Sequence, residues 1–205
     1  MPTLRTILFT ILAILLAASL APSIYSADGP NTETLQALQN AYSMQLGAFE
    51  RNRAFAMKAD EENFPGAALL FRAVARSAQI QYTNLIDAIR MMGFAPQATV
   101  ETPFIESTKD NLQTALNKAE ALEKDNSYSV YIKRAKTEGS PYGAKVLDNL
   151  RQQESQNVRL FKAALKNFDQ LRRPVPGYYV CAASGYVSAA IDAAHCIGSD
   201  WDLEK

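Results

Sequence analysis

The stretch from Ala54 to Gly93, AFAMKADEENFPGAALLFRAVARSAQIQYTNLIDAIRMMG, decides the fold. It predicts the end of one long helix, a short turn and a second long helix. Asn63 is a suitable N-cap, and Pro65 stands near the start of the second helix, where its missing N–H is harmless. Apolar and small residues then recur at helical spacing until Gly93 ends the run. They are Phe71, Val74, Ala75, Ala78, Tyr82, Leu85, Ile89 and Met92.

The rest of the chain predicts the other helices of a bundle and a long connection between them. The first helix begins near residue 32. A third begins at Ser107, whose spacing to Asp110 resembles a capping box, and runs to Glu138. A fourth begins at Ser140-Pro141, a cap followed by proline at the first helical position. Residues 94–106, between the second and third helices, contain two prolines and are too long for a tight turn, so they suit a crossover between two helix pairs.

The N-terminus has the pattern of a signal peptide over residues 1–26. A short basic start is followed by an apolar run, Ile7 to Leu20, that is too short to span a bilayer comfortably. Small residues suited to cleavage follow it. We therefore expect an exported protein of the periplasm or cell envelope, and the alternative is an uncleaved membrane anchor.

Charge does not point to a nucleic acid. Cleavage after residue 26 would remove one base, Arg5, and no acid, which leaves one net negative charge. No basic patch is interleaved with aromatic residues, so a nucleic-acid partner is not expected. Contact with a membrane is expected only through the signal segment, if that segment is retained.

Several phrases resemble the rubrerythrin family, over nearly all of the chain after residue 30. They are KADEE-x-F at 58–64, LFRA-x-A at 70–75, NLQ-x-A at 111–115, A-x-x-EG at 135–139 and the tail YYVCAASGY…CIGSDW from residue 178. The resemblance implies a ferritin-like four-helix bundle over residues 31–171, with a long crossover between helices 2 and 3. It also implies a small β-rich, rubredoxin-like tail over residues 177–205.

The family's activity would be peroxide reduction, with electrons passing from a rubredoxin iron to a di-iron site that cleaves the O–O bond. Its ligand pattern is one Glu on the first helix, Glu-x-x-His on the second, two Glu three apart on the third and Glu-x-x-His on the fourth. Counting from the shared phrases assigns these positions to Gln45, to Ala78 and Gln81, to Glu120 and Glu123, and to Glu154 and Asn157. Three carboxylates remain, and the only histidine, His195, lies in the tail, so we do not expect a normal di-iron centre.

Three carboxylates that face one core would repel one another, unless one takes up a proton, pairs with a base or shares a cation. A pocket of Glu120, Glu123 and Glu154 with the amides of Gln45, Gln81 and Asn157 would suit one hard ion, Ca, Mg or Mn. Residual iron is a further alternative. The favoured interpretation is a metal-free layer of hydrogen-bonded amides and partly protonated acids.

The tail departs from the family in the same way. Its two Cys-x-x-Cys knuckles keep their first cysteines, Cys181 and Cys196, and have Ser184 and Ser199 at the second places. Serine is a poor ligand for iron or zinc. Because the family's knuckles converge on one iron and export would expose them to oxidation, we predict a Cys181–Cys196 disulfide.

Ligands are thus missing at both ends of the family's electron path. The sequence predicts an exported, rubrerythrin-like protein without iron redox chemistry, with a role in binding or assembly. It would act as a homodimer or as a subunit of an envelope complex. The alternative is a peroxide reductase or iron-handling oxidoreductase with a remodelled metal site.

Overall fold

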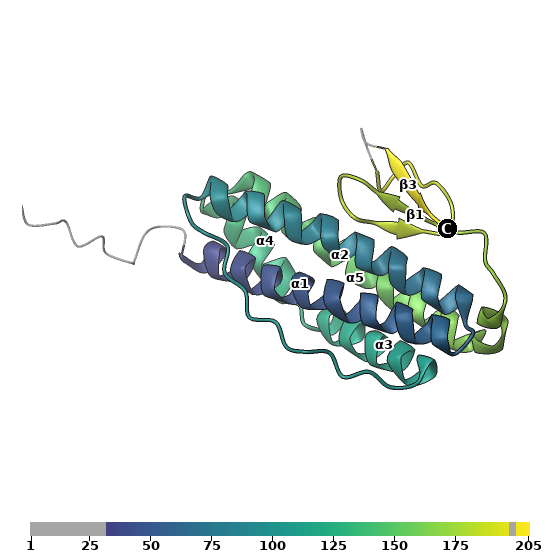
Figure 1. Cartoon of the computed structure of the whole chain (residues 1–205). Coiled ribbons are helices and arrows are strands. Elements are labelled where there is room, and N and C mark those ends of the chain that lie inside the picture. Colours follow the sequence, from purple (N-terminus) through teal and green to yellow (C-terminus); the bar gives the residue numbers. More distant parts are fainter. Residues whose placement is uncertain (1–31, 197–199) are drawn as a thin grey trace, which may run out of the picture.

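Two antiparallel helices, α1 (Thr32–Glu61) and α2 (Pro65–Met91), form the predicted hairpin (Figure 1). The computed structural model describes residues 32–196 and 200–205, so the predicted signal peptide, residues 1–26, lies outside the described residues. The predicted N-cap of α2 is wrong by one position, because Phe64 holds it. Asn63 instead closes the turn with φ of 60°, a left-handed conformation that asparagine tolerates better than most residues.

The second half contains α3 (Thr108–Lys124), α4 (Ser127–Thr137) and α5 (Pro141–Lys166). The third helix was predicted as continuous, but it is interrupted after Lys124. The carboxylate of Asp125 accepts hydrogen bonds from the backbone N and the Oγ of Ser127, at 3.2 and 3.0 Å. Such local side-chain bonds offer the backbone an alternative to the helix.

The helices confirm a four-helix, ferritin-like bundle whose third helix consists of α3 and α4. The crossover between α2 and α3 runs along the outside of α1 (Figure 1). The hydroxyl of Ser107 caps α3 by accepting from the backbone N of Asp110 at 3.3 Å, as predicted.

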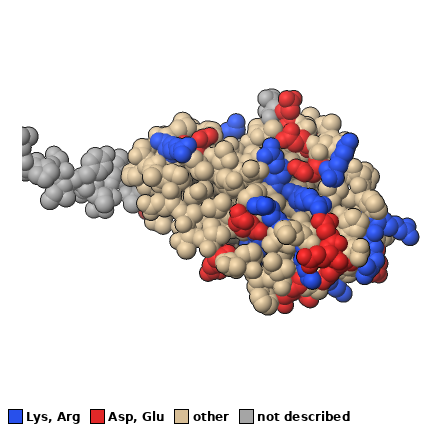
Figure 2. Space-filling model, viewed as in Figure 1, with Lys and Arg blue, Asp and Glu red and all other residues tan. Residues whose placement is uncertain are grey.

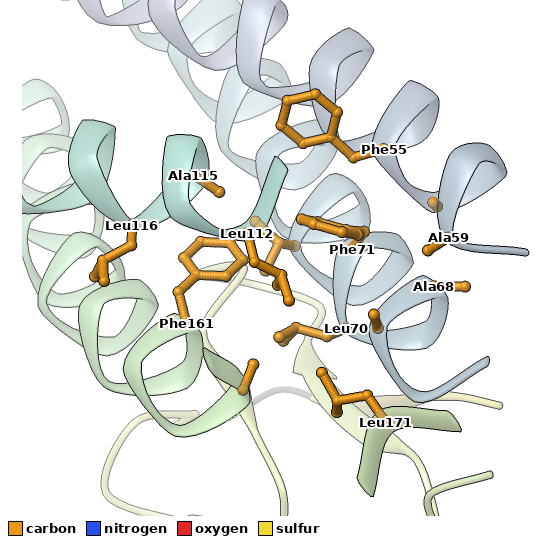
Figure 3. Close-up of a cluster of buried hydrophobic side chains, with 14 of the residues drawn as sticks. Phe55, Ala59, Ala68, Leu70, Phe71, Leu112, Ala115, Leu116, Phe161 and Leu171 are labelled. Atoms are coloured by element: carbon orange, nitrogen blue, oxygen red, sulfur yellow. The ribbon is translucent and has the colours of Figure 1, made fainter. Parts of the chain in front are cut away.

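The bundle has two apolar clusters with polar residues between them. One cluster is built around Phe55, Phe71 and Phe161, with the first two rings 5.4 Å apart edge to face (Figure 3). The other is nearer the α4 end and includes Leu38 and Leu147. Between the residues of these two clusters, three helices carry buried polar side chains: Gln45 on α1, Gln81 on α2, and Glu154 and Asn157 on α5.

A short 3-10 helix, η1 (Phe168–Arg172), leads to the tail. Strands β1 (Tyr178–Cys181), β2 (Val187–Ser188) and β3 (Trp201–Glu204) form an antiparallel sheet in the order β2-β1-β3. The sheet lies against α2 (Figure 1), where Val180 and Val187 pack on Ala73 and Ile80. The predicted β-rich tail is therefore present and is docked on its own bundle.

The surface of the described part of the chain is charged, and its long helices carry charged residues. On the face in Figure 2, acidic and basic side chains lie intermixed. No helix in residues 32–196 is both long and apolar enough to cross a membrane.

Candidate functional site

Glu154 is the carboxylate at the centre of the bundle. It lies on α5 and only 6% of its surface is exposed. Its Oε1 accepts a hydrogen bond from Nε2 of Gln45 on α1 at 3.1 Å, and its Oε2 accepts one from Nδ2 of Asn157 at 3.2 Å. Both carboxylate oxygens therefore have an amide donor.

These bonds extend a chain of donors that begins in the tail. The backbone N of Val187 donates to Oε1 of Gln153 at 2.9 Å, and Nε2 of Gln153 donates to Oδ1 of Asn157 at 2.7 Å. Asn157 in turn donates to Glu154. Every donor along this chain is directed toward the carboxylate, and hydrogen bonds aligned in this way polarise one another.

Arg51 of α1 shares the interior with Glu154. Burial lowers the pKa of the Arg51 guanidinium, and the charge of Glu154 opposes that change. Burial raises the pKa of Glu154, against the hydrogen bonds of Asn157 and Gln45 and the charge of Arg51. Arg51 and Glu154 make no ion pair within 4 Å, so their charges interact over a longer distance.

A cavity of about 740 Å³ lies beside these groups. Its walls come from α1, α2, α3, α5 and the crossover. Small residues on the inward faces leave this space: Gly47, Ala48, Ala78, Ala115 and Ala119. On the crossover side the lining residues Val100, Glu101 and Phe104 are exposed, so the cavity opens to solvent there.

Five of the predicted positions lie together, on the wall of this cavity: Gln45, Ala78, Gln81, Glu154 and Asn157. Ala78 is buried and small, which leaves room where the family pattern has a glutamate. Gln81 is also buried, and its Nε2 atom has no hydrogen-bond partner among the described residues.

The structure places Glu120 and Glu123 outside this cavity, although Glu123 and Glu154 both line a second, smaller one of about 120 Å³. Glu120 pairs with Lys162 at 2.8 Å and Lys124 at 3.5 Å, and the hydrogen bond from Lys162 is the main cause of its lowered pKa. Glu123 is exposed. The prediction placed both by counting back from Gly139 along an unbroken helix, and the interruption after Lys124 changes that count.

Six residues of α3 line the cavity, Thr114, Ala115, Lys118, Ala119, Ala121 and Leu122, and the predicted pair is not among them. Among the described residues, no group of three or more His, Cys, Asp or Glu side chains is placed to hold a metal ion.

Four polar residues of the interior were not assigned to the site from sequence: Arg51, Asn52, Ser77 and Gln153. Asn52 does lie at helical spacing from Gln45 on the buried face of α1, which was a usable signal. No sequence signal marked Arg51 or Gln153 as inward-facing. Each is next to a predicted inward position, and the neighbour of an inward residue on a helix usually faces another side.

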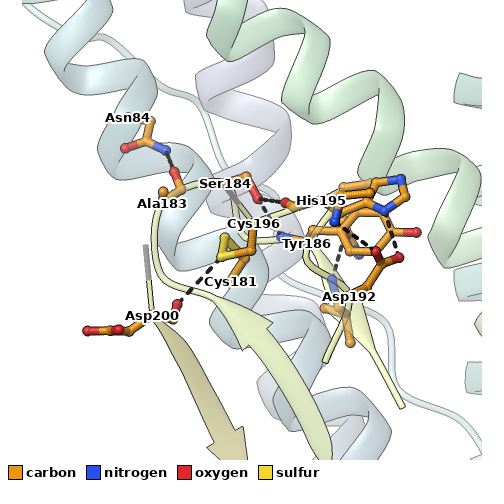
Figure 4. Close-up of a disulfide and its surroundings, with 12 residues drawn as sticks. Asn84, Cys181, Ala183, Ser184, Tyr186, Asp192, His195, Cys196 and Asp200 are labelled. Atoms are coloured by element: carbon orange, nitrogen blue, oxygen red, sulfur yellow. Dashed lines mark hydrogen bonds and ion pairs between the residues drawn. A yellow bond between two sulfur atoms is a disulfide. The ribbon is translucent and has the colours of Figure 1, made fainter. Parts of the chain in front are cut away.

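The tail contains the predicted disulfide between Cys181 and Cys196, with Cα atoms 5.6 Å apart (Figure 4). Ser184 has a local role there: its Oγ donates to the carbonyl of His195 and accepts from the backbone N of Tyr186, at 3.3 and 3.2 Å. Ser199 lies outside the described residues. Cysteine binds a metal as a thiolate, and neither sulfur is a thiolate in the disulfide.

Four long helical segments, a crossover between the second and third, and a polar centre define a ferritin-like protein. Two solved structures, which differ in their sequence identity to this chain, have the same fold. The all-ferrous, fully reduced state of nigerythrin matches with a TM-score of 0.67, 26% identity and 76% coverage of each chain. Desulfovibrio desulfuricans bacterioferritin, solved with its di-iron site in different catalytic states, matches with a TM-score of 0.63 and 14% identity. The match covers 80% of this chain and 96% of that one, and at this identity it shows the fold alone.

The chain belongs to the rubrerythrin family, whose model matches residues 36–165. Nigerythrin of Nitratidesulfovibrio vulgaris is 27% identical over 165 residues, which are 80% of each protein. Rubrerythrin-2 of Clostridium acetobutylicum is 23% identical over 168 residues, or 81% of this chain and 91% of that protein. The family predicted from sequence is thus confirmed.

Proposed function

We propose that this protein is an exported member of the rubrerythrin family that has exchanged di-iron chemistry for a binding or assembly role. The observation that carries the proposal is the donor set around Glu154. Each oxygen of its carboxylate accepts a hydrogen bond from one amide, and the side chain of Arg51 lines the same cavity.

These residues do not fit a di-iron centre. Two irons need several bridging and terminal carboxylates together with imidazole ligands. The helices direct one carboxylate, Glu154, into the cavity, and the other acids on its wall, Glu101 and Glu106, are exposed residues of the crossover. Arg51 would also repel a cation, which weakens the case for a single Ca, Mg or Mn ion.

Metal analysis tests this proposal directly. The full chain purified from its own compartment should contain far less than two irons per bundle. With added ferrous iron and peroxide it should show no saturable turnover. Turnover that is stoichiometric and that Glu154→Ala abolishes would contradict the proposal and favour the alternative, a peroxide-reducing oxidoreductase with a remodelled metal site.

Export forms the second part of the proposal. It rests on the pattern of residues 1–26 and on the disulfide, since disulfides persist in oxidising compartments. We expect a mature N-terminus near Ala27. Intact-mass measurement of the exported protein checks it, and a mass that still includes residues 1–26 would favour a membrane anchor.

Assembly as a homodimer or as a subunit of an envelope complex completes the proposal. Several large apolar side chains are exposed on the bundle and its crossover, and Phe104 is 79% exposed. Such side chains suit contacts with another chain when they form a patch. Light scattering on the full chain gives the assembly state, and a strictly monomeric protein would contradict the homodimer.

A further inference from the structure

The crossover between α2 and α3 forms one wall of the central cavity. Six consecutive residues of it, 99–104, line the cavity, and they lie on the side where it opens to solvent. Residues 94–106 are neither helix nor strand, whereas the other walls are helices. The crossover is therefore the wall that can move without the unwinding of a helix.

Two amide side chains anchor the crossover at its ends. Nε2 of Gln39 on α1 donates to the carbonyl of Ala95, and its Oε1 accepts from the backbone N of Gln97, both at 2.8 Å. Nδ2 of Asn111 on α3 donates to the carbonyl of Glu106, and its Oδ1 accepts from the backbone N of Glu106, both at 3.0 Å. Each anchor binds the backbone at two points, so both ends of the segment are fixed.

The segment between the anchors, residues 98–105, is held much less tightly. It makes no hydrogen bond or ion pair with any described residue. Its contact with α1 is apolar: a Cβ built on Gly47 would lie 3.9 Å from Cγ1 of Val100, so Val100 packs over a glycine. Backbone groups that bond only to water do not resist opening, and a segment with few buried contacts opens at low free-energy cost.

The interior behind this segment suits an apolar molecule. Its polar side chains Gln45, Glu154 and Asn157 already bond to one another. The volume of about 740 Å³ lies in the usual range for small-molecule sites, roughly 300–1,000 Å³. Apolar side chains from three helices line the space: Val74 and Ala78 on α2, Ala115 and Leu122 on α3, and Phe161 on α5.

Exposed apolar side chains border the mouth of the cavity. Met44, Val100 and Phe104 line the cavity and are 39%, 38% and 79% exposed. Two of them belong to the crossover itself. Apolar side chains that gather at the mouth of an apolar space favour the entry of an apolar molecule there.

We propose that residues 98–105 are a lid, which moves between its two anchors and admits small apolar molecules to the central cavity. In the closed position Val100 packs over Gly47, and opening separates these two residues while Gln39 and Asn111 keep the ends in place. This inference rests on the proposed binding role, for which it names the ligand class and the route of entry.

Fluorine NMR with fluorobenzene as the probe tests the cavity. We expect saturable binding to the full chain. Ala48→Trp places an indole on the cavity wall and should weaken binding about tenfold or more. Ala182→Trp, at an exposed position of the tail, is the matched control and should bind like the wild type. No saturable binding, or unchanged binding by an Ala48→Trp variant that melts cooperatively, would overturn the proposal.

A cross-link tests the lid. In the double variant Gly47→Cys, Val100→Cys the new side chains lie within reach of a disulfide, given the 3.9 Å approach of Val100 to the Gly47 Cβ position. The oxidised form should exchange bound and free fluorobenzene at least about tenfold more slowly than the reduced form. The wild type, taken through the same oxidation and reduction, controls for the native Cys181–Cys196 disulfide.

Loss of an anchor should have the opposite effect. Gln39→Ala removes both bonds at residues 95–97, so exchange should become about fivefold faster, as for the loss of one ordinary hydrogen bond. Gln36→Ala is the matched control, because Gln36 lies on the same helix and bonds to Asn40 at 3.2 Å. Exchange in Gln39→Ala that is no faster than in Gln36→Ala would contradict the anchored lid.

Two outcomes separate this inference from the proposed function. Equal exchange rates in the oxidised and reduced cross-link variant would overturn the lid but leave the absence of iron chemistry standing. Iron at two per bundle would overturn the proposed function whatever fluorobenzene does.

Discussion

At the scale of single residues, Glu154 makes the stability of the protein depend on pH. Burial raises its pKa above the ordinary value of 4.5. The folded state then holds a proton that the unfolded state releases, so the free energy of unfolding falls as pH rises from about 4.5 through the folded pKa. Glu154→Gln cannot titrate and should lose this component, whose slope is at most about 1.4 kcal/mol per pH unit.

Urea unfolding between pH 4.5 and 8 measures this effect. Glu62 and Glu120 have lowered pKa values, the first through hydrogen bonds from Thr108 and the second through Lys162. The stabilisation from these two carboxylates is fully present above pH 4.5 and is lost only as pH falls through their lower folded pKa values. Neither of them therefore changes the free energy of unfolding between pH 4.5 and 8. Glu123→Gln, which changes an exposed carboxyl, should keep the wild-type profile. Parallel profiles for the wild type and Glu154→Gln would contradict the prediction.

The same residues show how far sequence could predict the site. Gln45, Gln81, Glu154 and Asn157 were placed correctly on one cavity because α1, α2 and α5 are continuous, so counting along them preserves the face. On α3 neither Glu120 nor Glu123 lines the cavity, since the Asp125–Ser127 hydrogen bonds interrupt the helix between Gly139 and the site. Arg51 could not be predicted, because its inward direction depends on how α1 rotates against α5.

At the scale of elements, the docking of the tail on α2 depends on Gly185. This glycine has φ of +76°, and a Cβ added there would lie 2.8 Å from the carbonyl oxygen of Ser77 and 3.1 Å from Cγ of Gln81. Gly185→Ala should therefore destabilise the protein by backbone strain, about 1–2 kcal/mol, and by an additional clash with α2. It should also lower hydrogen-exchange protection in β1 and β2.

Gly139→Ala is the matched control for this change. Gly139 has the same φ of +76°, but an added Cβ would have nothing within 4 Å. The difference between the two variants in denaturant unfolding gives the cost of the clash alone. Equal destabilisation by the two alanines would show that the tail does not press on α2 at this point.

At the scale of the whole molecule, the tail and the cavity should respond as one unit through Gln153. Its two amide atoms join the backbone N of Val187 to Asn157, which donates to Glu154, and Gln156 binds the carbonyl of Val187 at 3.0 Å. Gln153→Met keeps the volume but leaves the Val187 N–H and the Asn157 Oδ1 buried without this partner. Each such group costs about 1–3 kcal/mol, so for the two groups we expect a loss of about 2–6 kcal/mol in the free energy of unfolding.

The position of the effect distinguishes this coupling from a simple loss of stability. Gln153→Met should lower hydrogen-exchange protection at Val187 and also shift the pH window in which Glu154 titrates, because Asn157 loses the donor that orients it. Gln152→Met is the matched control, since Gln152 bonds to Asp148 at 2.8 Å and does not join the chain. If Gln153→Met leaves the Glu154 titration unchanged while the tail loosens, the tail and the cavity are independent, and the hydrogen-bond chain between them serves only to dock the sheet.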